Sequence, residues 1–344
     1  MATLGGGGGM GATIRDVARL AGVSRGTVSR VLNDQPRVDP QTRVRVLQAI
    51  ADLDFSPSML ARGLSIGRTH SVGVVVPFIT RPSIVERLRG IEGALSTTPY
   101  DLIVFNVETR QRRDNVLRDL TRGERVDGII LVGLSPDDAM AASADRPGLP
   151  TVLIDSHHPR FSRVITNDVE GGRQAARHLV ELGHRRIAFL GDTPPMAFTY
   201  PASRLRYRGV RMALRSAGLD LPDRYTIMRD PGRTRARELT RELLVGPMPP
   251  TAIICASDLQ AIGAREAARD LGIAVPEQLS IIGYDDLDIA GYLGLTTIRQ
   301  PLFESGVSGA RLLLGQLSTG NRQPVREVLG IELIARSTTG PPPA

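Results

Sequence analysis

Short apolar runs alternate with longer amphipathic stretches in the chain after residue 70. The runs are rich in Val and Ile, which is typical of strands buried on both faces; they cover residues 72–76, 102–105, 128–132, 151–154, 187–190, 251–255 and 280–283. The stretches between them have apolar residues at the spacing of one helix face and cover residues 84–95, 112–120, 171–182, 204–217, 234–244 and 259–271. This alternation predicts parallel sheets joined by right-handed helical crossovers.

The series of strands and helices starts again after about Val164. The run at 72–76 and the helix after it have counterparts in the run at 187–190 and the helix that follows. Such a restart predicts two similar α/β lobes. Because open α/β sheets bind ligands beyond the carboxyl ends of their strands, we expect a ligand cleft between the lobes.

Three short helical patterns precede the α/β part of the chain. The first follows Thr13 and stops at Gly22, the second follows Ser24 as its N-cap, and the third begins at Asp39-Pro40. Their expected core positions are Ile14, Val17, Ala18 and Ala21, then Val28, Val31 and Leu32, then Val44, Leu47, Ile50 and Leu53. Two short helices joined by a tight glycine-containing turn predict a helix-turn-helix, whose second helix enters the DNA major groove.

Positive charge is concentrated in this N-terminal segment. The 344 residues carry 43 basic and 36 acidic side chains, a formal charge of +7, and every basic residue is arginine. Up to Arg68 there are nine arginines and five aspartates, a surplus of +4 that leaves +3 for the rest of the chain. A basic segment attached to a nearly neutral body is the electrostatic footprint of a nucleic-acid-binding head.

The composition also argues against enzymatic function. A chain without lysine has neither a Walker phosphate loop nor a Schiff-base lysine. Cys255, the single cysteine, lies in an apolar run and is expected to be a core residue. His157 and His158 lack further ligands at metal spacing, and Asp285 and Asp286 are adjacent at a strand end, where neighbouring side chains point apart. We therefore expect no enzymatic activity, no metal and no cofactor.

The start of the chain has no signal-peptide pattern, and no apolar run approaches the roughly 18 residues of a membrane span. We therefore expect a cytoplasmic protein with no membrane partner. Residues 1–11, which contain five consecutive glycines, are expected to be disordered. Whether translation begins at Met1 or Met10 stays open.

Nine sequence motifs make the chain similar to the lactose and galactose repressor (LacI/GalR) family of transcriptional regulators. In the head they are TIRDVA (13–18), AGVS (21–24), TVSRVLN (27–33) and PSMLARGL (57–64). Later in the chain they are SVGVVVP (71–77), RVDGII (125–130), LGHRRIA (182–188), IGYDD (282–286) and LTTIRQP (295–301). The resemblance covers essentially all of residues 12–339, so the motifs together form a strong signal.

The resemblance implies an N-terminal all-α helix-turn-helix head followed by an α/β two-lobed, periplasmic-binding-protein-like effector domain. The implied segments are a DNA-binding domain at 12–56, a hinge helix and linker at 57–69, and an effector-binding domain at 70–339. We expect lobe 1 to comprise about 70–164 and 296–325, and lobe 2 about 165–295 and 326–339.

The resemblance also assigns residues to DNA. By position in the family, Arg25, Gly26 and Arg30 read base edges, and the arginine fork suits the O6 and N7 acceptors of guanine. Phosphate contacts are expected from Thr13, Ser24, Thr27, Ser29 and Asn33. The alternative for Arg25 and Arg30 is that they are solvated charges on an exposed helix face.

The resemblance implies that the segment after the head folds into a hinge helix when two protomers meet on DNA. Leu60, Ala61 and Leu64 are its expected minor-groove residues, with Leu64 as the apolar wedge at the operator centre. Gly63 replaces a better helix former, which weakens the helix by up to about 1 kcal/mol. The alternative is a linker leucine with no role.

The expected effector-binding residues are Phe78, Ser83, Asp155, Arg204, Arg206, Ser257, Asp258, Asp285 and Gln300. The resemblance implies this role for Arg204, Arg206 and Asp285, whereas Asp155, Ser257 and Asp258 are candidates because they lie at strand ends. Asp258 is an equally good candidate for the N-cap of the next helix. Many family members have two aromatic residues where this chain has Ser83 and Ile84, so stacking would depend on Phe78, Phe198 or Tyr200. The resemblance implies a sugar as the effector, and the missing aromatic residues make a smaller or more anionic ligand the alternative.

The predicted function is a repressor that binds a pseudo-palindromic operator on double-stranded DNA as a homodimer and responds to a small effector. The alternative from another class is a free solute-binding module, because the two-lobed body is also similar to periplasmic sugar-binding proteins. A third possibility is a constitutive DNA binder whose cleft is inactive.

Overall fold

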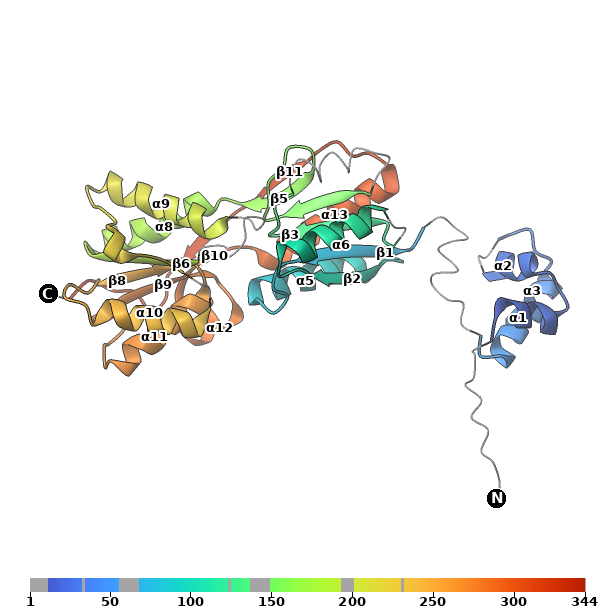
Figure 1. The fold of residues 1–344 in the computed structure, drawn as a ribbon, viewed down its shortest axis with the longest axis horizontal. Helices are drawn as coiled ribbons and strands as arrows, with labels where there is room; N and C mark the ends of the chain where they lie inside the picture. Colours follow the sequence, from blue (N-terminus) through green and yellow to red (C-terminus); the bar gives the residue numbers. More distant parts are fainter. Residues whose placement is uncertain are drawn as a thin grey trace, which may run out of the picture. The chain divides into compact units, whose positions relative to one another are not determined.

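The computed structural model describes residues 12–32, 35–55, 68–122, 125–136, 149–192, 201–229 and 232–343. The chain divides into two compact units, a head that ends at Thr69 and a body that begins at His70 (Figure 1). Predictions for residues 1–11, Asn33, Leu60, Ala61, Gly63, Leu64, Phe198 and Tyr200 lie outside the described residues. Within the described ranges, no helix has the length and apolar character needed to cross a membrane.

Three helices form the head: α1 (Ile14–Ala21), α2 (Arg25–Leu32) and α3 (Pro40–Asp52). The Asp16 carboxylate closes the first turn of α1 by accepting hydrogen bonds from the Thr13 N–H at 3.0 Å and hydroxyl at 2.7 Å. Gly22 ends α1 with φ +65°, a left-handed conformation that favours glycine. Asp39 caps α3 by accepting from the Thr42 N–H at 2.9 Å. The predicted helix starts are confirmed.

The predicted core face of α3 is wrong at two positions. Val44 and Leu47 are 66% and 52% exposed, whereas Val46 and Ala49 are buried against α1 and α2. The buried face of α3 passes through positions 46, 49, 50 and 53, at the spacing of one helix face, and positions 44 and 47 lie outside it. Ile50 and Leu53 do pack against the core, as predicted.

The first sheet of the body has the strand order β11-β5-β4-β3-β1-β2, and all its neighbouring strands are parallel. The strands are β1 (Ser71–Val76), β2 (Asp101–Asn106), β3 (Gly128–Val132), β4 (Thr151–Ile154), β5 (Ser162–Thr166) and β11 (Arg326–Leu329). Helix α6 (Arg110–Arg122) covers one face, and α5 (Pro82–Leu95) with α13 (Leu302–Thr319) covers the other.

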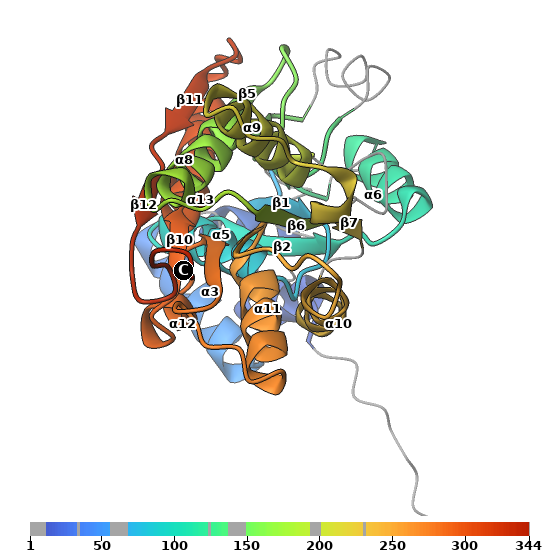
Figure 2. The same ribbon diagram turned by 90° about the vertical axis from the view of Figure 1, so that its left-hand side faces the viewer.

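The second sheet has the order β12-β10-β9-β8-β6-β7, with only the β10–β12 pair antiparallel. Its strands are β6 (Ile187–Asp192), β7 (Thr226–Arg229), β8 (Ala252–Cys255), β9 (Ser280–Asp285), β10 (Thr296–Arg299) and β12 (Glu332–Ile334). Helices α8 (Asp168–Glu181) and α9 (Ala202–Ser216) cover one face, and α10 (Arg233–Leu244) and α11 (Asp258–Asp270) cover the other (Figure 2). The short helix α12 (Asp288–Tyr292) precedes β10.

Two similar sheets, each with helices on both faces, confirm the predicted α/β lobes. The lobe boundaries differ from the expectation near the C-terminus. Strand β10 pairs with β9 in the second sheet, and β11 pairs with β5 in the first, so residues 296–299 and 326–329 exchange their expected lobes. The chain therefore passes between the lobes three times, after β5, after β10 and after β11.

Candidate functional site

The exposed face of α2 presents the predicted base-reading residues. Arg25, Gly26 and Arg30 are exposed, and helical geometry places them within an arc of about 140° on the side away from buried Val28 and Val31. Within the described part of the head, neither arginine has an ion-pair partner. The face thus offers two free guanidinium groups to a ligand, with no side chain at Gly26 to hold it away.

Hydroxyl groups surround the start of α2. Ser24 accepts a hydrogen bond from the Thr27 N–H at 3.1 Å, and the two hydroxyls lie 3.0 Å apart. Thr13 is exposed at the start of α1, and Ser29 is half-buried on α2. The N-cap of α2 therefore places the Ser24 and Thr27 hydroxyls at the same end of the helix as Arg25.

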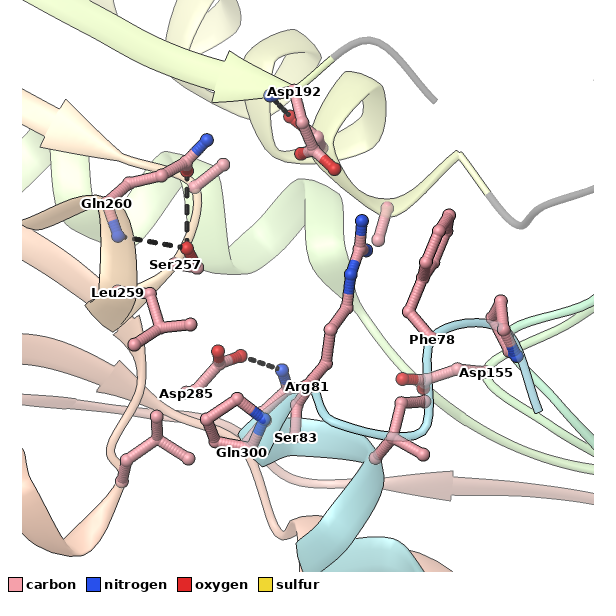
Figure 3. Close-up of a pocket in the computed structure, with 18 of the residues that line it drawn as sticks. Phe78, Arg81, Ser83, Asp155, Asp192, Ser257, Leu259, Gln260, Asp285 and Gln300 are labelled. Carbon is pink, nitrogen blue, oxygen red and sulfur yellow. Dashed lines mark hydrogen bonds between the residues drawn. The ribbon is translucent and has the colours of Figure 1, made fainter. Parts of the chain in front are cut away.

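A cavity of about 310 Å³ in the body is lined by residues of both lobes (Figure 3). Phe78, Arg81 and Asp155 lie on one side of Figure 3, and Ser257 and Asp285 lie on the other. Among the residues that the structure describes, the charged lining residues are three arginines and three aspartates: Arg81, Arg87, Arg206, Asp155, Asp192 and Asp285. The described part of the lining is therefore formally neutral.

Arg206 on α9 is fixed by its neighbours. Its Nε donates to Asp168 Oδ1 at 2.8 Å and its Nη1 to the Ala256 carbonyl at 2.6 Å, and its guanidinium lies 3.6 Å from the Tyr284 ring centroid. Burial alone would lower the pKa of Arg206, but the charge of Asp168 raises it above its ordinary value. Arg206 thus stays protonated and keeps one orientation in the cavity wall.

A second arginine, Arg87 on α5, lies deep in the cavity wall. Its Nη2 donates to Asp155 and, at 3.4 Å, to Gln300 Oε1. Gln300 in turn donates from Nε2 to Asp285, whose carboxylate lies 4.0 Å from Arg206. A continuous series of polar contacts therefore runs across the cavity from the first lobe to the second.

Both aspartates of this series lie at the end of a strand and have a positive φ angle. Asp155 comes directly after β4 and Asp285 is the last residue of β9, and their φ angles of +47° and +122° are unusual for residues with side chains. Backbone of this kind costs about 1–3 kcal/mol and is concentrated at functional sites. Burial raises the pKa of Asp285 to about 6, although Arg206 opposes the shift.

Comparisons with known proteins agree with this architecture. Residues 13–58 match the family "Bacterial regulatory proteins, lacI family", and residues 176–339 match a "Periplasmic binding protein-like domain". The ribose operon repressor of Escherichia coli K12 is 34% identical over 332 residues, which cover 95% of this chain and 99% of that protein. The chain belongs to the LacI family. It is therefore a DNA-binding transcriptional regulator and not an enzyme, as predicted.

Two solved structures extend the likeness to the LacI family. A lac repressor dimer bound to operator and the anti-inducer ONPF has a TM-score of 0.83 and 29% identity, covering 96% of this chain and 100% of that one. A LacI-family regulator from Enterococcus faecium with bound ribose has a TM-score of 0.68 and 29% identity, covering 79% of this chain and 99% of that one.

Seven of the nine residues expected to bind the effector line the cavity: Phe78, Ser83, Asp155, Arg206, Ser257, Asp285 and Gln300. Arg204 does not line it and is exposed, because it lies two residues from Arg206 and so points to another side of α9. Asp258 is also absent from the lining. Ser257 caps α11 by accepting from the Gln260 N–H at 3.3 Å, so the alternative of an Asp258 N-cap is wrong.

Asp258 is instead a buried connector. It accepts hydrogen bonds from the Thr297 hydroxyl at 2.6 Å and the Leu287 N–H at 2.8 Å, and it is fully buried. Burial raises its pKa to about 8. Asp258 therefore ties the start of α11 to β10 and to the loop after β9, behind the cavity wall.

Several lining residues were not predicted, among them Arg81, Arg87, Asp192, Ser203 and Gln260. Arg87 left a signal in the sequence. It occupies one of the positions of the buried face of α5 that also contains Ile84, Ile91 and Leu95. A charged residue in an apolar helical stripe indicates a buried partner, which here is Asp155.

Proposed function

We propose that this LacI-family protein is a homodimeric repressor whose operator affinity is set by a neutral sugar of pentose size bound in the cavity. The charge balance of the lining carries this proposal. Arg87 is paired with Asp155, and Arg206 is paired with Asp168 and lies near Asp285. Paired side chains offer donors and acceptors without a net charge, which suits hydroxyl groups better than a carboxylate or phosphate.

The comparisons support the same ligand class. One relative is named for repression of a ribose operon, and one structural relative has bound ribose. Phe78 is the aromatic residue among the described lining residues, and Arg81 lies 4.6 Å from its ring centroid. D-ribose is thus the first candidate.

The head would supply sequence recognition. Arg25 and Arg30 would read guanines in the major groove, and Thr13, Ser24, Thr27, Ser29 and Asn33 would hold phosphates. Two-fold symmetry of a dimer requires two half-sites, hence a pseudo-palindromic operator. Leu60, Ala61 and Leu64 would contact the minor groove at its centre. A regulator of this kind would act in the cytoplasm.

The test begins with selection of an operator from random duplexes by the full-length protein. Binding of that operator is then measured by gel shift at several salt concentrations, with and without D-ribose, D-xylose, D-glucose, adenosine and D-ribose 5-phosphate. We expect one palindromic consensus, and an effect of D-ribose on affinity of about 5- to 150-fold.

Three results would contradict the proposal. Salt-dependent binding without sequence preference would leave only a general affinity for DNA. A stronger response to D-ribose 5-phosphate than to D-ribose would assign an anionic effector to the cavity. A selected operator whose affinity none of the five compounds changes would favour a constitutive DNA binder.

A further inference from the structure

The buried face of α5 contains a charge that the fold does not need. Along this face Ile84, Ile91 and Leu95 pack onto the first sheet, and Arg87, only 3% exposed, occupies the position between Ile84 and Ile91. A buried ion pair stabilises a fold little, and an apolar residue in its place is often neutral or stabilising. The presence of Arg87 therefore requires another explanation than stability.

The guanidinium of Arg87 is only partly satisfied by the protein. Nη1 donates to the Ser83 carbonyl at 2.9 Å, and Nη2 donates to Asp155 and to Gln300. Nε is buried without an acceptor in the described residues. An arginine has five N–H groups. Two of those of Arg87 thus have no hydrogen-bond partner among the described residues, and Arg87 lines the cavity.

We propose that Arg87 determines the specificity of the cavity, an inference that rests on the proposed sugar-binding function. Arg87 and Asp155 together form one wall of the cavity, the Arg87–Asp155 wall, and this wall accepts only ligands with a pair of adjacent hydroxyls. The pair presents donors next to an acceptor, because the carboxylate of Asp155 accepts hydrogen bonds while the guanidinium donates them. One hydroxyl of a vicinal diol then donates to Asp155, and its neighbour accepts from Arg87.

The burial of both groups makes this wall selective. The side chains of Arg87 and Asp155 are 4% and 14% exposed, so a ligand that lacks one of the two hydroxyls leaves a desolvated donor or acceptor unpaired. Sites built around hydrogen-bonding groups reject analogues without the matching hydroxyl far more strongly than apolar pockets reject a missing methylene.

The test compares D-ribose with its 1-, 2-, 3- and 5-deoxy derivatives by isothermal titration calorimetry on the full chain. The variants are Arg87→Met, and Arg87→Met with Asp155→Asn, which removes the pair without leaving an unpaired buried carboxylate. The control is Arg89→Met on the same helix, where an exposed arginine pairs with Glu86 at 2.8 Å. Far-UV circular dichroism and thermal melting verify that each variant folds.

We expect the wild type and Arg89→Met to bind D-ribose about 10- to 100-fold more tightly than at least one deoxy derivative. In the double variant that preference falls to within about three-fold, because the wall no longer distinguishes the two sugars. A purely structural role for Arg87 would lower affinity for all five sugars equally and leave the preference intact, which would overturn the proposal.

The two proposals fail in different ways. If the wild type binds D-ribose but the folded double variant retains the full preference, the assignment of Arg87 is wrong and the sugar function stands. If the wild type binds neither D-ribose nor its derivatives, the sugar function is wrong and the role of Arg87 in reading a diol is overturned with it.

Discussion

At the scale of single residues, burial changes the charge state of side chains that the sequence presents as ordinary carboxylates. Asp258 is the clearest case, since its two hydrogen-bond donors, at Leu287 and Thr297, lie 29 and 39 residues later in the chain. Its ordinary pKa of 3.8 rises to about 8 in the folded protein because the group is buried. The folded state therefore holds a proton that the unfolded chain releases.

This shift predicts a pH-dependent effect of Asp258→Asn. Between pH 4 and 8 the folded protein binds more protons than the unfolded chain at this site, so the contribution of Asp258 to stability decreases as the pH rises and is constant above about 8. Asparagine stays neutral and keeps an acceptor for the Leu287 N–H. We expect the melting temperature of the variant to rise relative to wild type from pH 5 to 8. A difference that is constant over this range would contradict the assignment.

A second residue prediction concerns the head. Arg30→Ala is expected to lose about 1–3 kcal/mol of discrimination at one G·C position of the operator. Competition binding against operators with single base-pair changes measures this loss. Arg45→Ala, which removes an equal charge from exposed α3, is the control and should weaken all operators alike. Uniform weakening by Arg30→Ala as well would make Arg30 a phosphate contact.

The sequence predicts site residues that follow a recognisable strand end. It does not predict residues that reach the cavity only because distant segments pack together. Asp155 is predictable from its place after an apolar run and Asp285 from the family motif at its strand end, and both line the cavity. Arg87 was missed because its partner Asp155 lies 68 residues away and no local pattern joins them. Arg204 and Arg206 are alike in the sequence, and only the rotation of α9 separates the exposed one from the buried one.

At the scale of elements, glycines set how closely the helix pairs approach. A Cβ on Gly306 of α13 would overlap the carbonyl oxygen of Arg87 on α5, and a Cβ on Gly172 of α8 would overlap that of Arg206 on α9. The two buried arginines of the cavity are thus each held by a helix crossing that only glycine permits. Both lobes therefore position a guanidinium group in the same way, at a close helix crossing.

Substitutions within α13 test whether the crossing of α13 and α5 requires glycine. Gly306→Ala is expected to destabilise the body by about 1–3 kcal/mol, because a backbone contact must open. Gly315→Ala on the same helix meets no atom within 4 Å and should stabilise by about 0.5–1 kcal/mol through helix propensity. Urea unfolding followed by circular dichroism distinguishes the two. Stabilisation by Gly306→Ala as well would show that the crossing tolerates a methyl group.

The elements themselves were predictable to different degrees. All seven apolar runs became strands. Six of them are buried on both faces, which produces a continuous apolar signal, whereas β2 is a partly exposed edge strand that is apolar in sequence. Strands β7 and β11 lie at sheet edges with mixed polarity and gave no such signal. The lobe membership of β10 and β11 could not be read from order along the chain, because it depends on which sheet edge each segment reaches.

At the scale of the whole molecule, sugar binding must alter the affinity of the head for DNA. A coupling of about 1–3 kcal/mol would suffice for regulation. Asp285→Asn removes a carboxylate from the cavity but keeps an acceptor for Gln300. We expect it to raise the D-ribose concentration for half-maximal effect on operator binding by at least about 10-fold. Gel-shift titrations of sugar at fixed operator measure this, and an unchanged midpoint would place the effector elsewhere.

The chain passes between the lobes three times, and two of these passages lie beside residues that form or support the cavity wall. Gln300 directly follows β10 at one passage, and Asp168, the partner of Arg206, stands just after another. A ligand that contacts Gln300 and Arg206 therefore acts close to the segments that connect the lobes, not at the outer edges of the lobes. A rotation of the lobes about these connecting segments would move the amino ends of the strands of the first sheet farther than their carboxyl ends, because displacement in a rotation grows with distance from the axis. His70, where the body begins, directly precedes the amino end of β1.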